Sequence, residues 1–300
     1  MSLSELRTLV ARHAPEGVHH TAIPGVLVSR ISEPGPPEES TTGTVLAIIV
    51  QGGKRLAVGE RVHHYGEGQY LVASVDLPVT GEFTDASPAH PALGVAVELN
   101  PSVVADLLLA PAALEAPRSA GRPSPAPGIA VSDATPELLD AATRMLRLLD
   151  RPADAPVLAP LIEREIHWLL MSGEQSATVR QMGLADSGVS RVRHAARWIR
   201  DRYAETIRIE DLAGMARMSA SAFHRNFHAV TALSPIQFQK QIRLQEARMR
   251  LIADPSDVAG IAYAVGYESA SQFSREYRRQ FGAPPGQDAI RLRAAAGAGS

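Results

Sequence analysis

The 300-residue sequence contains no cysteine. Disulfide bonds, thiolate nucleophiles, cysteine-ligated zinc and thiol redox sensing are therefore excluded, and the absence fits a reducing compartment. The sequence also lacks an apolar run of about 18 residues, so no transmembrane helix is expected. Its first residues do not show the basic-then-apolar order of a signal peptide. We accordingly expect a cytoplasmic protein without a membrane segment.

Little net charge is present, and it is unevenly distributed. The formal net charge of the whole chain is −2. From Ser190 to Ser300 there are 17 Lys and Arg residues against 10 Asp and Glu, whereas the preceding part has 13 against 22. A basic C-terminal third on an acidic body indicates a partner that carries phosphate groups.

One short pattern occurs twice. Ser-Ala-Ser-Ala-Phe-His-Arg-Asn-Phe at 219–227 and Ser-Ala-Ser-Gln-Phe-Ser-Arg-Glu-Tyr at 269–277 are identical at five positions, offset by 50 residues. An apolar-Ala pair precedes each copy, Leu212-Ala213 and Ile261-Ala262, and this pair is offset by 49 residues. The repeat therefore predicts two helix-turn-helix units, the second with a turn one residue longer. Ser219 and Ser269 each precede a second helix and are expected to cap it.

The two faces of each second helix differ in character. Side chains four residues apart share a helix face, so Phe223 and Phe227, like Phe273 and Tyr277, are predicted to point into the domain. The opposite faces carry short hydroxyl groups beside an arginine, which suits the major groove of DNA. The predicted DNA contacts are Ser221, His224, Arg225, Ser271, Ser274 and Arg275.

The segment between the two units predicts a rigid spacer. A helix over 235–253 would be about 28 Å long, close to the roughly 34 Å between successive major grooves on one face of DNA. One chain would then read a two-part site, with Arg243, Arg248 and Arg250 on the spacer expected to contact phosphates. The alternative is a pair of helical hairpins in a purely structural domain. The matched repeat and the local positive charge weigh against it.

The first hundred residues have a different periodicity. After an amphipathic helix expected at 3–13, short runs rich in β-branched residues alternate with Gly and Pro turn signals. Even spacing of such runs predicts a small antiparallel barrel or jelly roll. The expected strands are 26–31, 45–50, 54–58, 69–73, 79–84 and 93–99.

These patterns together predict an α+β protein of two domains. The expected parts are a β-barrel domain at 1–110, a proline-rich connector with two helices at 111–188, an α domain at 189–290 and a disordered tail at 291–300. The connector helices, at 136–150 and 159–171, suit either a dimer contact or packing against the β domain. The sequence does not decide between these two roles.

A metal-dependent enzyme is the main alternative for the β domain. Enzymes of the cupin class usually carry His-x-His, a carboxylate and a distant His, whereas the adjacent His63 and His64 would face opposite sides of a strand. Glu67 and His90 do not restore that spacing, and His167, on an apolar helix, is expected to be packed. No convincing Ser/His/Asp set or Gly-rich phosphate loop is present. We therefore predict no catalytic residue, metal or cofactor.

Residues 189–286 resemble the DNA-binding domain of the AraC/XylS transcriptional regulators. The resemblance implies that the third and sixth helices of this domain, which carry the six predicted contacts, enter the major groove. The sequence departs from the family at 285–288, Pro-Gly-Gln-Asp, where many members carry an aromatic-Arg pair. The motifs that carry the resemblance are Ile209-Glu210-Asp211-Leu212-Ala213, Met218-Ser219, Phe223-x-Arg225-x-Phe227, Ser234-Pro235, Ile261-Ala262-x-x-Val265-Gly266-Tyr267, Ser271-Gln272-Phe273-Ser274-Arg275 and Phe281-Gly282-x-Pro284.

The N-terminal half is similar to the cupin-like N-terminal domain of AraC-type regulators, through the stretches 48–54, 68–71 and 161–166. This resemblance implies a transcriptional regulator that senses a small molecule, binds a double-stranded DNA operator, forms a homodimer and contacts RNA polymerase. It names neither the effector nor the operator. Two alternatives stay open: a cupin-type metal enzyme fused to a DNA-binding domain, and a β domain that only mediates protein contacts.

Overall fold

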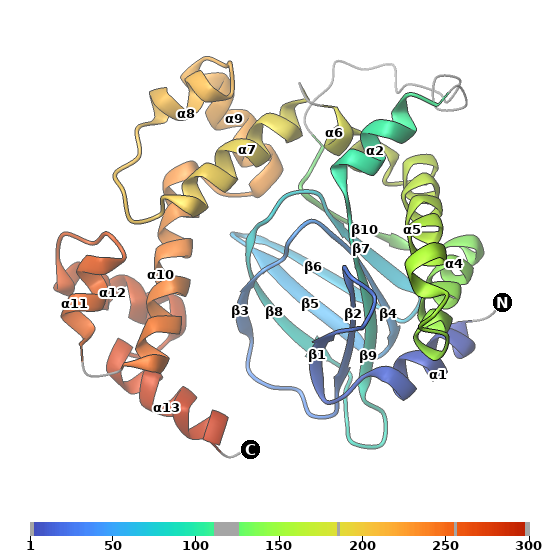
Figure 1. Cartoon of the computed structure of the whole chain (residues 1–300). Helices are drawn as coiled ribbons and strands as arrows, with labels where there is room; N and C mark the ends of the chain where they lie inside the picture. Colours follow the sequence, from blue (N-terminus) through green and yellow to red (C-terminus); the bar gives the residue numbers. More distant parts are fainter. Residues whose placement is uncertain (1–2, 111–125, 185–186, 255–256, 298–300) are drawn as a thin grey trace. The chain divides into compact units, whose positions relative to one another are not determined.

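The computed structural model describes residues 3–110, 126–184, 187–254 and 257–297 (Figure 1). The chain forms two compact units. One contains residues 1–193 together with residues 225–232, and the other contains residues 194–224 and 233–300. None of the described helices is both long and apolar enough to span a bilayer.

The N-terminal unit is built on two antiparallel sheets. The described strands of the first sheet run in the order β1-β2-β9-β4-β7-β10, and those of the second in the order β3-β8-β5-β6. The strands are β1 (Gly17–His20), β2 (Val26–Ile31), β3 (Glu38–Thr41), β4 (Val45–Gln51), β5 (Gly53–Val58), β6 (Arg61–Gly66), β7 (Gln69–Ala73), β8 (Pro78–Thr84), β9 (Ala92–Glu98) and β10 (Ile129–Asp133).

Of the predicted barrel or jelly roll, the barrel is wrong, because the two described sheets remain separate and do not close. The chain passes from β4 in one sheet to β5 in the other through Gly52, which has a φ of 76°. A Cβ atom on Gly52 would lie 3.0 Å from the Cβ atom of Ala92. Only glycine tolerates both this left-handed conformation and this close approach. The tight turn at Gly52 therefore carries the chain into the second sheet, and β5 does not continue the hydrogen bonding of the first sheet.

Helices cover one face of the six-stranded sheet. Leu6, Leu9 and Val10 of α1 share a core cluster with sheet residues such as Val28 and Leu46. The apolar faces of the two connector helices join the same cluster, so these helices pack against the β domain. The helices of this unit are α1 (Leu3–His13), α2 (Pro101–Leu108), α4 (Pro136–Arg147), η1 (Leu148–Asp150), α5 (Ala155–Ser172) and α6 (Ser176–Gly183).

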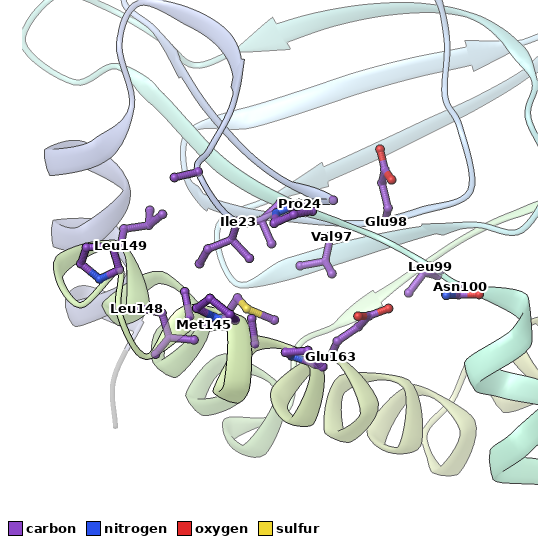
Figure 2. Close-up of a pocket in the computed structure, with 18 of the residues that line it drawn as sticks. Ile23, Pro24, Val97, Glu98, Leu99, Asn100, Met145, Leu148, Leu149 and Glu163 are labelled. Carbon is purple, nitrogen blue, oxygen red and sulfur yellow. The ribbon is translucent and has the colours of Figure 1, made fainter.

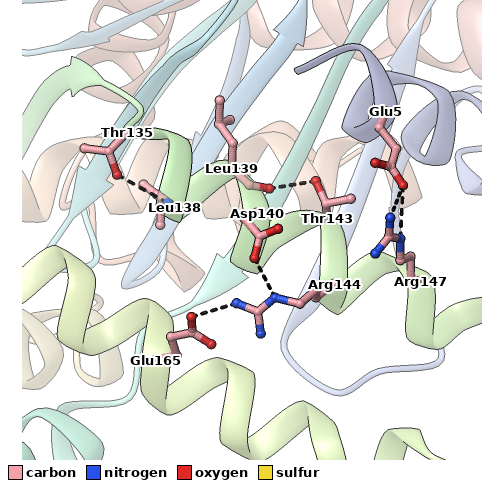
Figure 3. Close-up of polar contacts among 9 residues, drawn as sticks. All are labelled: Glu5, Thr135, Leu138, Leu139, Asp140, Thr143, Arg144, Arg147 and Glu165. Carbon is pink, nitrogen blue, oxygen red and sulfur yellow. Dashed lines mark hydrogen bonds and ion pairs between the residues drawn. The ribbon is translucent and has the colours of Figure 1, made fainter. Parts of the chain in front are cut away.

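Polar contacts fix α4 against its neighbours (Figure 3). The Arg144 guanidinium bonds to Asp140 on its own helix and to Glu165 on α5, both at 2.7 Å. Arg147, one turn further along α4, pairs with Glu5 of α1. Because these groups are half-exposed, each pair adds little free energy of folding. Their bonds instead set the position of α4 relative to α1 and α5.

The C-terminal part of the chain is helical. The spacer helix α10 (Pro235–Ala253) has 19 residues, as predicted, and begins with a capping box formed by Ser234 and Gln237. The tail expected to be disordered is helical as far as Gly297. The other helices are α7 (Gly188–Asp201), α8 (Ile209–Met215), α9 (Ala220–Thr231), α11 (Val258–Ala264), α12 (Ala270–Phe281) and α13 (Pro285–Gly297).

Candidate DNA-binding site and ligand cavity

The two helix-turn-helix units repeat the same backbone hydrogen bond. The Met218 N–H donates to the carbonyl oxygen of Ala213 at 2.9 Å, and the Tyr267 N–H donates to that of Ala262 at 3.0 Å. These bonds are offset by 49 residues, whereas the capping serines at 219 and 269 are offset by 50. The extra residue of the second turn is therefore Glu268, immediately before the cap.

The second helix of each unit begins at its serine. The Ser219 Oγ accepts from the Ala222 N–H at 3.3 Å. The Ser269 Oγ accepts from the Gln272 N–H at 3.4 Å. Each bond satisfies a backbone donor that a helix start would otherwise leave free, so both predicted caps are confirmed.

The inward faces are packed as predicted. Phe223, Phe227, Phe273 and Tyr277 are all fully buried. In the second unit the rings of Phe273 and Tyr277 meet edge-on, with centroids 5.4 Å apart. This burial turns the opposite side of each helix outward.

All six predicted DNA contacts lie on α9 and α12. Five of them are exposed: Ser221, His224, Arg225, Ser271 and Arg275. Ser274 is half-buried. The structure thus brings three predicted contacts together on each helix, with an exposed arginine in both sets.

An ion-pair network ties α12 to the spacer helix. The Lys240 ammonium of α10 lies 2.9 Å from Glu276 of α12. The Tyr267 hydroxyl donates to the same carboxylate at 3.0 Å, and the Gln272 amide donates at 3.2 Å. Burial by itself raises the pKa of Glu276, but the bonds from Lys240, Gln272 and Tyr267 outweigh it and hold that pKa below its usual value. The carboxylate therefore stays charged and holds α12 against the spacer helix α10.

A second carboxylate joins three helices. Asp288 of α13 is fully buried and lies 2.9 Å from Arg248 of α10. It also accepts from the Tyr277 hydroxyl of α12 at 2.9 Å and from Arg291 at 2.5 Å. Asp288 falls in the stretch where the sequence departs from the family pattern.

The three spacer arginines, which were expected to contact phosphates, all have hydrogen-bond partners within the protein. Arg243 donates to the carbonyl oxygens of Tyr203 at 2.7 Å, Glu205 at 3.0 Å and Gly266 at 2.8 Å. Arg248 pairs with the buried Asp288, as described above. The last of the three, Arg250, donates to the Tyr203 hydroxyl at 2.7 Å. Arg243 therefore links the segment before α8 to the turn of the second helix-turn-helix.

Gly266 sits at this junction, and its substitution is expected to be costly. Its φ is 92°, and a Cβ atom there would lie 2.3 Å from the carbonyl oxygen of Ala204. Gly282 has a similar φ of 78° but open space around it. We expect Gly282→Ala to cost about 1–2 kcal/mol from backbone strain alone, and Gly266→Ala to cost clearly more because Ala204 must move. Urea denaturation of both variants measures the difference, and equal losses would contradict the steric argument.

A large cavity lies in the N-terminal unit, between β2 and β9 on one side and α4 and α5 on the other (Figure 2). Its volume is about 750 Å³. Apolar side chains such as Ile23, Val97 and Met145 form most of the wall. Volumes of this size are typical of small-molecule sites. Sequence reasoning did not find this cavity, because its walls come from segments far apart in the chain.

His167, predicted to be packed, is fully buried beside this cavity. Its Nδ1 atom bonds to the carbonyl oxygen of Glu163 at 2.7 Å, and its Nε2 atom accepts from the Asn100 N–H at 2.9 Å. Burial lowers the pKa of His167, so the ring is neutral and holds two wall residues in place.

The space between the two sheets is much smaller. It has a volume of about 70 Å³ and is lined by Lys54, Tyr65 and Phe83, among others. Burial lowers the pKa of the Lys54 ammonium, which lies 4.4 Å from the centroid of the Phe83 ring.

The histidines of the β domain do not gather. His63 is half-buried and the adjacent His64 is exposed on the other side of β6. His19 and His20 are exposed on β1. Among the residues that the structure describes, no three His, Asp or Glu side chains are grouped to hold a metal ion.

Two capped helices with outward arginines, joined by a spacer and carried on a basic unit, define a DNA-binding protein of the double helix-turn-helix class. Residues 22–178 match the family model "AraC-type transcriptional regulator N-terminus", and residues 212–289 match the model "Helix-turn-helix domain". The chain belongs to the AraC-type transcriptional regulators, which are DNA-binding proteins and not enzymes.

Individual relatives match the C-terminal part. The transcriptional activator RhaS of Escherichia fergusonii is 31% identical over 96 residues, 32% of this chain and 34% of that protein. The transcriptional regulator MtrA of Neisseria gonorrhoeae is 31% identical over 97 residues, 32% of each chain. The matched region therefore spans about a third of the length of these two relatives.

A solved structure covers both units. A ligand-free ToxT variant from Vibrio cholerae matches 90% of this chain and 99% of its own, with a TM-score of 0.53 and 10% identity. Wild-type ToxT bound to an unsaturated fatty acid matches with a TM-score of 0.52 and 9% identity. At this identity the likeness concerns the fold alone.

Proposed function

We propose that each chain reads a two-part operator by placing α9 and α12 in successive major grooves. Ser221, His224 and Arg225 contact one half, and Ser271, Ser274 and Arg275 contact the other. The observation that carries this proposal is the exposure of both arginines on helices of matching geometry, separated by a 19-residue spacer. A guanidinium group recognises guanine through its O6 and N7 atoms, while short hydroxyl side chains allow close approach of the helix.

A binding-site selection followed by footprinting tests this reading. We expect protection of two major-groove half-sites on the same face of the DNA, about one helical turn apart, for each bound chain. A variant with Arg275→Ala should keep protection of one half and lose the other. Protection of a single groove by the wild-type protein would contradict the two-part model.

We further propose that the N-terminal unit senses a small molecule and changes DNA affinity when it binds. The 750 Å³ cavity supports this role, because the space between the sheets, at 70 Å³, holds little more than water. ToxT, which shares the fold, has been solved with an unsaturated fatty acid bound. In this proposal 1–110 is the sensor, 111–188 is a connector whose helices complete the wall of the cavity, and 189–290 is the DNA reader of a cytoplasmic homodimer that contacts RNA polymerase.

The sensing role is tested through linkage. A ligand that binds one conformation better must shift the equilibrium between conformations, and therefore the affinity for DNA. Measuring operator affinity across a panel of metabolites should identify at least one that changes it. If none does while operator binding is intact, the N-terminal unit mediates only protein contacts.

A further inference from the structure

The wall of the cavity described above is rich in hydrogen-bond acceptors and poor in donors. Among the described residues that line it, two are carboxylates, Glu98 and Glu163, and none is Lys, Arg or His. Asn100 supplies the side-chain amide, whose nitrogen is a donor, while its Oδ1 atom is already used as the N-cap of α2. A ligand with an anionic group would therefore meet repulsion without a compensating cation.

Glu163 is the acidic group that faces this space. Figure 2 shows its carboxylate extending from α5 toward Leu99 of the opposite wall, whereas Glu98 leaves the chain on the side away from Val97. In the part of the chain that the structure describes, the Glu163 carboxylate has no ion-pair partner. Two residues further along α5, Glu165 is paired with Arg144. Glu163 therefore has an unpaired charge because it lies in the wall of the cavity, where no cation among the described lining residues is available to it.

Prolines add to the shortage of donors. Five of the lining residues are Pro24, Pro101, Pro152, Pro156 and Pro160. Proline has a carbonyl acceptor but no N–H donor. Pro160 lies inside α5, so the helix lacks the N–H that would normally reach the carbonyl oxygen of Pro156. A ligand that carries donors would satisfy such an acceptor.

We propose that this cavity binds an apolar organic cation, with the Glu163 carboxylate as its counter-ion. The apolar wall takes the hydrocarbon body, and the carboxylate takes an ammonium or comparable head group. The inference deepens the proposed sensing role and rests on it for any effect on DNA binding. Occupation of the site itself depends only on the geometry and charge of the wall.

Two probes with the same alkyl chain and opposite charge test the proposal: dodecyltrimethylammonium and dodecanoate, each below its micelle concentration. Isothermal titration calorimetry on the full chain should give one site that prefers the cation roughly tenfold or more, as expected for a partly shielded ion pair. Glu163→Gln should lower cation affinity roughly tenfold with little change for dodecanoate. Glu163→Lys should reverse the preference, which a merely unfolded variant would not do.

Glu60→Gln is the matched control. Glu60 is exposed in the turn between β5 and β6, so the substitution removes the same charge from the acidic unit at a distance from the cavity. It should leave both affinities unchanged. Equal or tighter binding of dodecanoate by the wild-type protein, or the same loss in Glu60→Gln as in Glu163→Gln, would overturn the assignment.

The operator affinity measured with each probe separates this inference from the proposed function. Cation binding that depends on Glu163 but leaves DNA affinity unchanged supports the site and refutes sensing through it. An anionic metabolite that shifts DNA affinity through this cavity would support sensing and overturn the ligand class.

Discussion

Asp288→Ala is expected to lower the free energy of unfolding of the C-terminal unit by about 3–5 kcal/mol, the usual cost of breaking a buried ion pair. The Asp288 side chain is fully buried, and that of Arg248 is only 17% exposed. Removing the carboxylate leaves the Arg248 guanidinium without its partner in a largely dry site and frees the Tyr277 hydroxyl. Three helices lose their common contact.

Urea denaturation in a Trp168→Phe background measures this loss, because Trp198 on α7 then reports the C-terminal unit. Asp201→Ala, which removes an exposed carboxylate, should stay within about 0.5 kcal/mol of the parent protein. A loss below about 1 kcal/mol for Asp288→Ala would show that the site repacks or admits water.

The same carboxylate predicts the acid sensitivity of the unit. Burial alone raises the pKa of Asp288, but the bonds from Arg248 and Tyr277 outweigh it, so the folded-state pKa lies below the usual range. A lowered pKa contributes stability above the unfolded-state pKa, about 3.9, and loses it as the pH falls through the folded-state value. The free energy of unfolding of the wild-type protein should therefore decrease once the pH drops below about 4. Asp288→Asn should remove that part of the acid transition.

Arg225→Ala and Arg275→Ala are each expected to weaken specific DNA binding by about 1–3 kcal/mol and to relax base preference in one half-site. Each arginine is the exposed cation among the three predicted contacts on its helix, next to hydroxyl groups that contribute less. The double variant should lose both contributions, roughly additively, because the two residues belong to separate helices.

Binding to an operator library distinguishes base recognition from phosphate attraction. Arg197→Ala, which removes an exposed arginine from α7, should at most weaken binding uniformly and reduce its salt dependence. If Arg225→Ala or Arg275→Ala also weakens all sequences equally, that arginine contacts phosphate and the assignment of a base contact is wrong.

Local signals predicted much of the fold. The spacer helix, the two serine caps and six of the nine described strands before residue 100 follow from proline, serine and β-branched patterns that act over a few residues. The missed strands β1, β3 and β6 are mostly exposed, and β6 contains adjacent histidines after a charged turn. Such strands form because the neighbouring strand supplies their hydrogen bonds, and no apolar alternation marks them. The short helix α6 was also missed.

The sequence predicts the parts of the site that depend on neighbouring residues and misses those that depend on distant ones. The DNA-facing positions follow from helical spacing alone, since burial of one face exposes the other. The internal role of Arg243 depends on partners more than 20 residues away, and the ion pair of Asp288 depends on Arg248, 40 residues away. The sequence gives no pointer to either contact. The same holds for the cavity, whose walls join residues 22–26, the end of β9 and the two connector helices.

Because of where this cavity lies, the residues that shape it are largely separate from the residues that pack between the two sheets. Its lining comes largely from a loop and from one side of α4 and α5, while the space between the sheets is nearly filled. Substitutions such as Ala155→Ser or Leu149→Met would alter the shape of the recess without opening the interior of the sandwich. Under the proposed sensing role, related regulators could diverge in what they recognise through substitutions in this wall while retaining one scaffold.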